Sequence, residues 1–173
     1  MHYTELPSKE DMTSLHGETW TWVEGVVAPL DGALAGPVSE VACVAYDVWG
    51  YRVLSGQPLD ARRTSFVLER GVERFVVRLD ELALERDKLA STRFWTTGRA
   101  RSTAALAFLE RHGLAGGASK VMQVVEWTVP LGATVRVWGR TRVLVDPSGD
   151  DAGYRAPPRR PVLQARKLEV VSG

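Results

Sequence analysis

The chain has 173 residues, of which 45% are hydrophobic and 25% charged, and its formal net charge is +1. This composition is ordinary for a globular protein, and a nearly neutral chain lacks the strong positive field that would make nucleic acid the expected partner. Its single cysteine cannot form an internal disulfide, no segment reaches the roughly 18 apolar residues needed to span a bilayer, and the N-terminus lacks signal-peptide features. We therefore predict a cytoplasmic protein, at most peripheral to a membrane, with an extension at residues 1–18 and one domain at residues 19–173.

The first half of the chain is rich in strand signals separated by Gly, Pro and Asp. Alternating apolar residues predict strands, and Trp20 and Trp22 fall on one face of the first strand, which we expect to carry a bulge at Gly25. The predicted elements are a helical turn at Ser8–His16, a strand at Thr19–Ala28, a loop at Pro29–Pro37, a central or bent strand at Val41–Leu54, a loop at Ser55–Arg63, and a hairpin of Thr64–Glu69 and Val72–Leu79.

The second half contains the clearest helix signal. Ser102 is a suitable N-cap and Gly113 a suitable stop for a helix at Ser102–His112. Segment Asp80–Thr97 fits either a helical turn or a polar strand connection. The remaining predicted elements are a hairpin over Val121–Val145 turning at Pro130–Gly132, a loop at Asp146–Pro161 and a strand at Val162–Val171.

Together these elements predict a mainly β (α+β) fold with roughly seven strands. Because such a protein must bury one face of its sheet, we expect a curled antiparallel sheet or a small barrel. One short helix at about residues 102–112 is expected to accompany it.

Several segments, in their order, resemble the BAM ("beside a membrane") or GIDE-type domain of Mulan-like mitochondrial ubiquitin ligases and many bacterial proteins. The segments are Trp22–Ala28, Gly36–Ser39, Ala42–Tyr46, Ser65–Leu68, Phe108–Gly113 and Glu126–Gly139. The resemblance spans about residues 20–172 and implies a non-catalytic adaptor module that usually lies beside membrane helices. The chain shows neither flanking transmembrane helices nor the Cys/His array of a RING domain. The expected partner is therefore a protein, membrane-associated by analogy, and ligase activity is not carried over.

The first candidate binding site lies on the strand after Gly132. Val135 and Val137 point to one face, whereas Arg136, Trp138, Arg140 and Arg142 share the other. Guanidinium groups interleaved with an indole suit a phosphate or a stacked base. The competing interpretation is a solvated sheet face on which the arginine stems cover Trp138.

The second candidate binding site precedes the predicted helix. Arg99 and Arg101 flank the helix N-terminus at Ser102, and no acidic residue lies between Lys88 and Glu110. The free amides of the first helical turn, together with these arginines, would suit an anion or an acidic partner. The alternative is a solvated basic loop with Phe94 and Trp95 packed in the core.

No residues form a recognisable catalytic or metal-binding pattern. Cys43 lies in an apolar strand and His112 at a helix end, while a zinc site would need four suitably spaced Cys or His ligands. We predict no catalytic residue, no metal and no cofactor, and we expect Glu126 to hold an arginine such as Arg140 across the hairpin. Two other functions stay open: a nucleic-acid- or anion-binding barrel that uses the Arg/Trp face, and a hydrolase or transferase whose acids come from distant strands.

Overall fold

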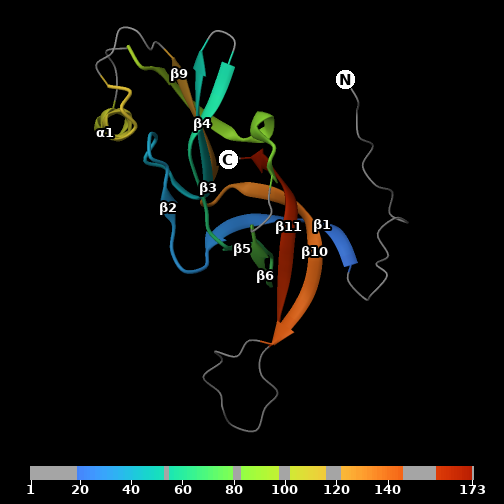
Figure 1. The fold of residues 1–173 in the computed structure, drawn as a ribbon. Helices are drawn as coiled ribbons and strands as arrows, with labels where there is room; N and C mark the ends of the chain where they lie inside the picture. Colours follow the sequence, from blue (N-terminus) through green and yellow to red (C-terminus); the bar gives the residue numbers. More distant parts are fainter. Residues whose placement is uncertain are drawn as a thin grey trace.

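The computed structural model describes residues 19–52, 55–79, 83–97, 102–115, 122–145 and 159–172 (Figure 1). The prediction of a mainly β fold with one short α-helix is confirmed for this part of the chain. The elements are β1 (Thr19–Pro29), β2 (Leu34–Ala35), β3 (Ala42–Arg52), β4 (Ser55–Arg63), β5 (Phe66–Arg70), β6 (Glu73–Arg78), β7 (Ala83–Leu84), the 3-10 turn η1 (Arg86–Lys88), β8 (Ala90–Trp95), α1 (Thr103–Arg111), β9 (Gln123–Pro130), β10 (Thr134–Val145) and β11 (Arg159–Ser172).

Five strands close into a barrel in the order β1-β5-β6-β11-β10, and β10 pairs back onto β1. All neighbours are antiparallel except β6 and β11, which pair in parallel. Numbered within the barrel, this order is 1-2-3-5-4-1, a Greek-key arrangement of the kind found in OB-type barrels. Alternate apolar residues fill the interior, among them the fully buried Phe66, Leu68, Val77, Val135, Leu163 and Leu168.

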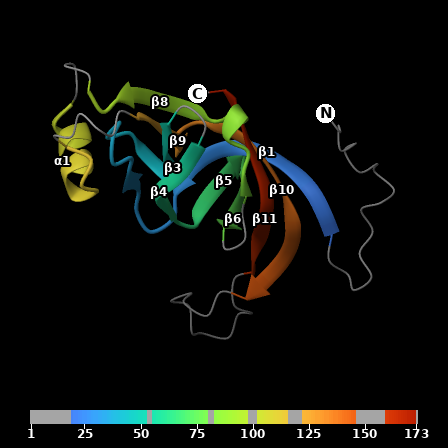
Figure 2. The same ribbon diagram turned by 45° about the horizontal axis from the view of Figure 1, so that its top comes forward.

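A second sheet is built from two insertions into the barrel. The insertion between β1 and β5 supplies β2, β3 and β4, and the insertion between β6 and β10 supplies β8 and β9. β3 lies at its centre, paired antiparallel with β9 on one edge and with β2 and β4 on the other. Figure 2 shows this sheet beside the curved barrel strands, with β8 as the outer strand.

The hairpin predicted over Val121–Val145 is wrong in its pairing. Both strands and the turn are present, but β9 pairs with β3 and β8 whereas β10 pairs with β1 and β11. The turn is therefore a corner at which the chain passes from the second sheet into the barrel. Gly132 has a φ of 78°, a left-handed conformation that glycine adopts without steric cost.

Helix α1 packs on one face of the second sheet, and its predicted ends are confirmed. The Ser102 hydroxyl caps it by accepting the Ala105 N–H at 3.1 Å, and Gly113 follows with a φ of 65°. The expected apolar stripe is largely correct, although Leu106 is 45% exposed. The buried members of this second core are Val38, Cys43, Tyr46, Val48, Ala105, Phe108, Leu109, Met122 and Val124.

Ser55–Arg63, predicted as a loop, is strand β4. It is largely exposed and carries Gly, Pro and Asp, so backbone pairing with β3 holds it in place without an apolar pattern to reveal it. In the same way, Asp80–Thr97 contains β7, η1 and β8, and the loop Pro29–Pro37 contains β2. The described residues consequently hold eleven strands rather than the roughly seven expected.

The Thr64–Leu79 hairpin is confirmed by β5 and β6, which pair across a turn at Gly71 with a φ of 59°. The final predicted strand is confirmed by β11. The bulge expected at Gly25 is absent, because β1 pairs with β10 in continuous register through this residue. Instead, a Cβ at Gly25 would lie 2.5 Å from the Glu69 carbonyl oxygen, so the missing side chain lets β1 and β5 approach closely. The predicted turn at Ser8–His16 and most of the loop at Asp146–Pro161 lie outside the described residues.

No helix in the described part of the chain combines the length and apolar character that crossing a membrane requires.

Barrel closure depends on a close approach between β10 and β11 at Gly139. A Cβ there would lie 2.3 Å from the backbone oxygen of Gln164, whereas a Cβ at Gly50, also buried, would meet side-chain ends alone, Met122 at 2.8 Å and Leu59 at 3.3 Å. We expect Gly139→Ala to lower the free energy of unfolding by about 1–3 kcal/mol, and Gly50→Ala to cost less, because a side-chain end moves more easily than backbone. Urea denaturation of the two variants checks this. Equal losses would contradict the proposed backbone contact at Gly139.

Candidate functional site

The first predicted site forms part of a larger surface on the outside of the barrel, which we call the Arg–Trp face. The antiparallel register of β1 and β10 places Trp20 opposite Arg140 and Trp22 opposite Trp138. Since directly opposed residues of paired strands share a face, two tryptophans join the predicted residues. The Arg–Trp face consists of Trp20, Trp22, Arg136, Trp138, Arg140 and Arg142.

The side chains of this face stack on one another. The rings of Trp20 and Trp138 are 4.5 Å apart at an interplanar angle of 28°. The Arg140 guanidinium lies 5.9 Å from the Trp20 ring centre, and the Arg136 guanidinium lies 4.9 Å from that of Trp22. Stacking and cation–π contacts of this kind hold aromatic and arginine side chains in fixed positions. The arginine guanidinium groups thus lie over Trp20 and Trp22, whereas Trp138 stacks on Trp20.

Glu169 of β11 is the acidic anchor of this surface. It accepts a 2.8 Å hydrogen bond from Arg136 and another 2.8 Å bond from Lys88, the last residue of η1. Arg140 donates to the Gln164 side chain at 3.2 Å, and Arg142 is exposed at the end of the face. The indole N–H of Trp138 has no hydrogen-bond partner among the described residues. Arg136 and Lys88 thus share the Glu169 carboxylate.

The second predicted site is described only in part. Arg99 and Arg101 lie outside the described residues, whereas Ser102 sits at the start of α1. Its hydroxyl donates to the Val38 carbonyl at 3.3 Å besides capping the helix, so it already serves the fold. Trp95, expected in the core, is 53% exposed, because it points away from α1 while Phe94, its neighbour in β8, packs against the helix-side core.

Glu126 does not hold Arg140, because β9 and β10 belong to different sheets. Its fully buried carboxyl group instead accepts the backbone N–H of Val38 at 2.8 Å, the backbone N–H of Ser39 at 3.3 Å and the Ser39 hydroxyl. Gly36 leaves room for this arrangement, since a Cβ there would lie 2.7 Å from a Glu126 oxygen. Glu126 thus fastens the loop before β3 to β9.

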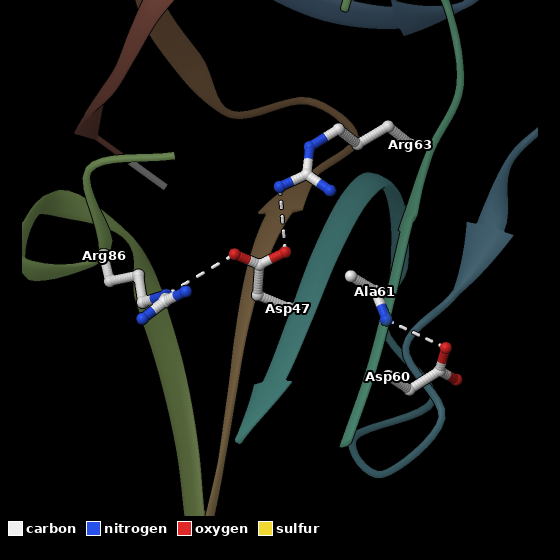
Figure 3. Close-up of polar contacts among 5 residues, drawn as sticks. All are labelled: Asp47, Asp60, Ala61, Arg63 and Arg86. Carbon is white, nitrogen blue, oxygen red and sulfur yellow. Dashed lines mark hydrogen bonds and ion pairs between the residues drawn. The ribbon is translucent and has the colours of Figure 1, made fainter. Parts of the chain in front are cut away.

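A second buried acid, Asp47 of β3, lies on the face of the second sheet opposite α1. Figure 3 shows it between two arginines: Arg63 of β4 donates at 3.0 Å, and Arg86 of η1 approaches at 3.4 Å. The Arg86 guanidinium also lies 3.9 Å from the Trp49 ring centre and 5.4 Å from that of Trp127. Sequence reasoning missed this cluster, although the alternating aromatics Trp49 and Tyr51 signalled a second aromatic face.

Cys43 and His112, the cysteine and the histidine among the described residues, both pack against other side chains of the fold. Cys43 is completely buried, and this burial raises the pKa of its thiol to about 11, which opposes formation of the reactive thiolate. His112 ends α1, with its ring 4.3 Å from that of Phe108. Within the described residues, no three His, Cys, Asp or Glu side chains are grouped so that they could hold a metal ion.

The hydrogen bonds that Lys88 and Arg136 donate to Glu169 make the free energy of unfolding depend on pH. The Lys88 hydrogen bond, aided by that of Arg136, lowers the pKa of this carboxyl in the folded protein. A depressed pKa stabilises the fold above the ordinary carboxyl pKa, and the contribution disappears as the pH falls through the folded-state value. We expect Glu169→Gln to destabilise the protein at neutral pH and to differ progressively less from the wild type in acid. Urea denaturation over a pH series measures this, and Glu110→Gln, an exposed change on α1, should show no such trend.

Comparison with known proteins gave no match: no protein-family model matches the chain, and neither a curated protein nor a solved structure does.

Proposed function

We propose that this protein is a non-catalytic binding module of the BAM/GIDE type that recruits a protein partner through the Arg–Trp face. The observation that carries the proposal is the stack of Trp20 on Trp138, with Arg140 over Trp20 and Arg136 over Trp22, on the outside of a closed barrel. Tryptophan and arginine are the residues most enriched at the energetic centres of protein interfaces. A surface on which they are already fixed loses little conformational entropy when a partner binds.

The surroundings of the buried acids support a binding function over a catalytic one. Glu126, Asp47 and Glu169 each accept hydrogen bonds or ion pairs from other groups of the protein, and they lie on different strands, β9, β3 and β11. General acid–base catalysis needs groups that converge on a substrate, and these acids instead fasten separate parts of the fold.

The charges of the face favour an acidic partner segment. The face carries Arg136, Arg140 and the exposed Arg142, and Glu169 pairs with Arg136 and Lys88. A carboxylate of the partner would pair with the arginines of this face, and an aliphatic or aromatic group would cover the tryptophans. Because the chain resembles adaptor domains that lie beside membranes, we expect the partner protein to be membrane-associated.

The test replaces Trp22 with a photo-reactive benzoylphenylalanine and cross-links the protein in its native cells. We expect one defined cross-linked partner, and we expect Arg140→Glu/Arg142→Glu to lower its yield by about tenfold or more. The control pair Arg52→Glu/Arg111→Glu makes the same charge change at exposed positions elsewhere and should leave the yield unchanged. Thermal unfolding shows whether both variants remain folded. Equal cross-linking yields in the two folded variants would refute the proposal.

Oligonucleotide binding is the second candidate, favoured by the juxtaposition of arginines and stacked tryptophans. OB-type barrels bind oligonucleotides on the face of their second and third strands. In this protein that face, on β5 and β6, does not support oligonucleotide binding. The cavity there, about 510 Å³, is lined mainly by valine and proline, and its arginine, Arg74, already pairs with Glu69 at 3.1 Å.

Fluorescence anisotropy with labelled single-stranded oligonucleotides distinguishes the two functions. A protein-recruiting module should bind them weakly or not at all even at low salt. Tight binding that falls steeply with salt, and that Arg140→Glu/Arg142→Glu abolishes, would establish the alternative.

A further inference from the structure

The outer edge of β8 is a second candidate binding surface, formed by residues outside the Arg–Trp face. Within the described part of the chain, β8 pairs with β9 alone and ends the second sheet. Figure 2 shows it running along the outside of the molecule. Five of its six residues are exposed, and its sequence, Ala-Ser-Thr-Arg-Phe-Trp, contains no proline. Free strand edges are usually blocked by proline, a bulge or a covering element, because they otherwise accept another strand.

The direction of the backbone groups follows from one hydrogen bond. The Thr96 N–H donates to the Met122 carbonyl at 3.0 Å, so Thr96 directs its backbone toward the β9 side. β8 and β9 pair without a register shift, and backbone direction alternates along a strand. Ser91, Arg93 and Trp95 therefore direct their N–H and C=O groups toward the free edge.

A cavity of about 400 Å³ lies between this strand and the start of α1. It is lined by Thr92, Arg93 and Phe94 of β8, by Ser102 and Ala105 at the helix, and by Val38, Ser39 and Val41 of the loop before β3. An edge strand with a helix-flanked cavity beside it offers both backbone bonds and a side-chain pocket, the combination used by domains that bind extended peptides.

The charge on this edge selects the kind of strand that it would accept. Arg93 is exposed, has no ion-pair or hydrogen-bond partner among the described residues, and lies in a stretch without acids from Lys88 to Glu110. Two copies of β8 paired about Arg93 would place these arginines opposite each other, and opposed like charges destabilise a sheet. An acidic segment is complementary to this edge, whereas a second copy of this chain is not.

We propose that the free edge of β8 binds an extended acidic segment of a partner protein as an added strand. The backbone groups of Ser91, Arg93 and Trp95 pair with the segment, a carboxylate of the segment pairs with Arg93, and one of its apolar side chains enters the cavity beside Phe94.

The test starts from a phage-displayed library of random peptides selected on the whole protein. We expect enrichment of peptides with an acidic residue near an aliphatic one. Hydrogen exchange followed by NMR then locates a selected peptide. Its binding should slow exchange at the amides of Ser91, Arg93 and Trp95 by about tenfold or more, because these amides lack a strand partner in the free protein. Failure to enrich such peptides, or protection confined to other residues, would overturn the proposal.

Two variants sharpen this result. Arg93→Glu should weaken the selected acidic peptide by about tenfold or more, whereas Arg111→Glu, the same change on α1, should not. Ser91→Pro removes one outward N–H and leaves the β8–β9 bonds in place, so binding should fall while the protein stays folded. If Ser91→Pro unfolds the protein, peptide binding by the Arg93→Glu variant alone tests the proposal. Binding that Arg140→Glu/Arg142→Glu abolishes and Arg93→Glu does not would place the peptide on the Arg–Trp face and refute this second site.

Discussion

Three backbone hydrogen bonds join the corner between β9 and β10 to a strand of each sheet. Leu131 donates to the Ala42 carbonyl at 3.0 Å, Gly132 donates to that of Val27 at 2.8 Å, and Val27 donates to that of Ala133 at 3.0 Å. These bonds join the start of β3 and the end of β1 to one turn. Because β9 carries β8 on one side of the corner and β10 carries the arginines on the other, both proposed binding surfaces take their positions from it.

Local signals accounted for much of the fold. The helix was predictable because a Ser102 cap, an apolar stripe and a Gly113 stop all lie within a dozen residues of one another. The alternation of valine and arginine in β10 correctly gave two unlike faces, but alternation says nothing about which strand lies alongside. The β9–β10 pairing was wrong for that reason, and β4 was missed because an exposed edge strand needs no apolar pattern.

The candidate site was predictable only where its residues share a strand. Arg136, Trp138 and Arg140 belong to one strand, so the sequence placed them together. Trp20 and Trp22 complete the surface from β1, more than a hundred residues earlier in the sequence, and only the strand register unites the two groups. Glu126 illustrates the converse error: an arginine was a reasonable partner for a buried acid, yet two backbone N–H groups and a hydroxyl satisfy it.

The closing of the barrel by β10 and β11 also bears on how the protein is made. β1 obtains its longest partner, β10, only from residues 134–145, and β10 in turn needs β11, at residues 159–172. Contacts between residues so far apart in sequence form slowly, since a long loop must close before they gain any energy. During synthesis on the ribosome, the edge of β1 that carries Trp20 and Trp22 therefore stays unpaired until nearly all of the described chain has emerged. The barrel can therefore close only late in synthesis.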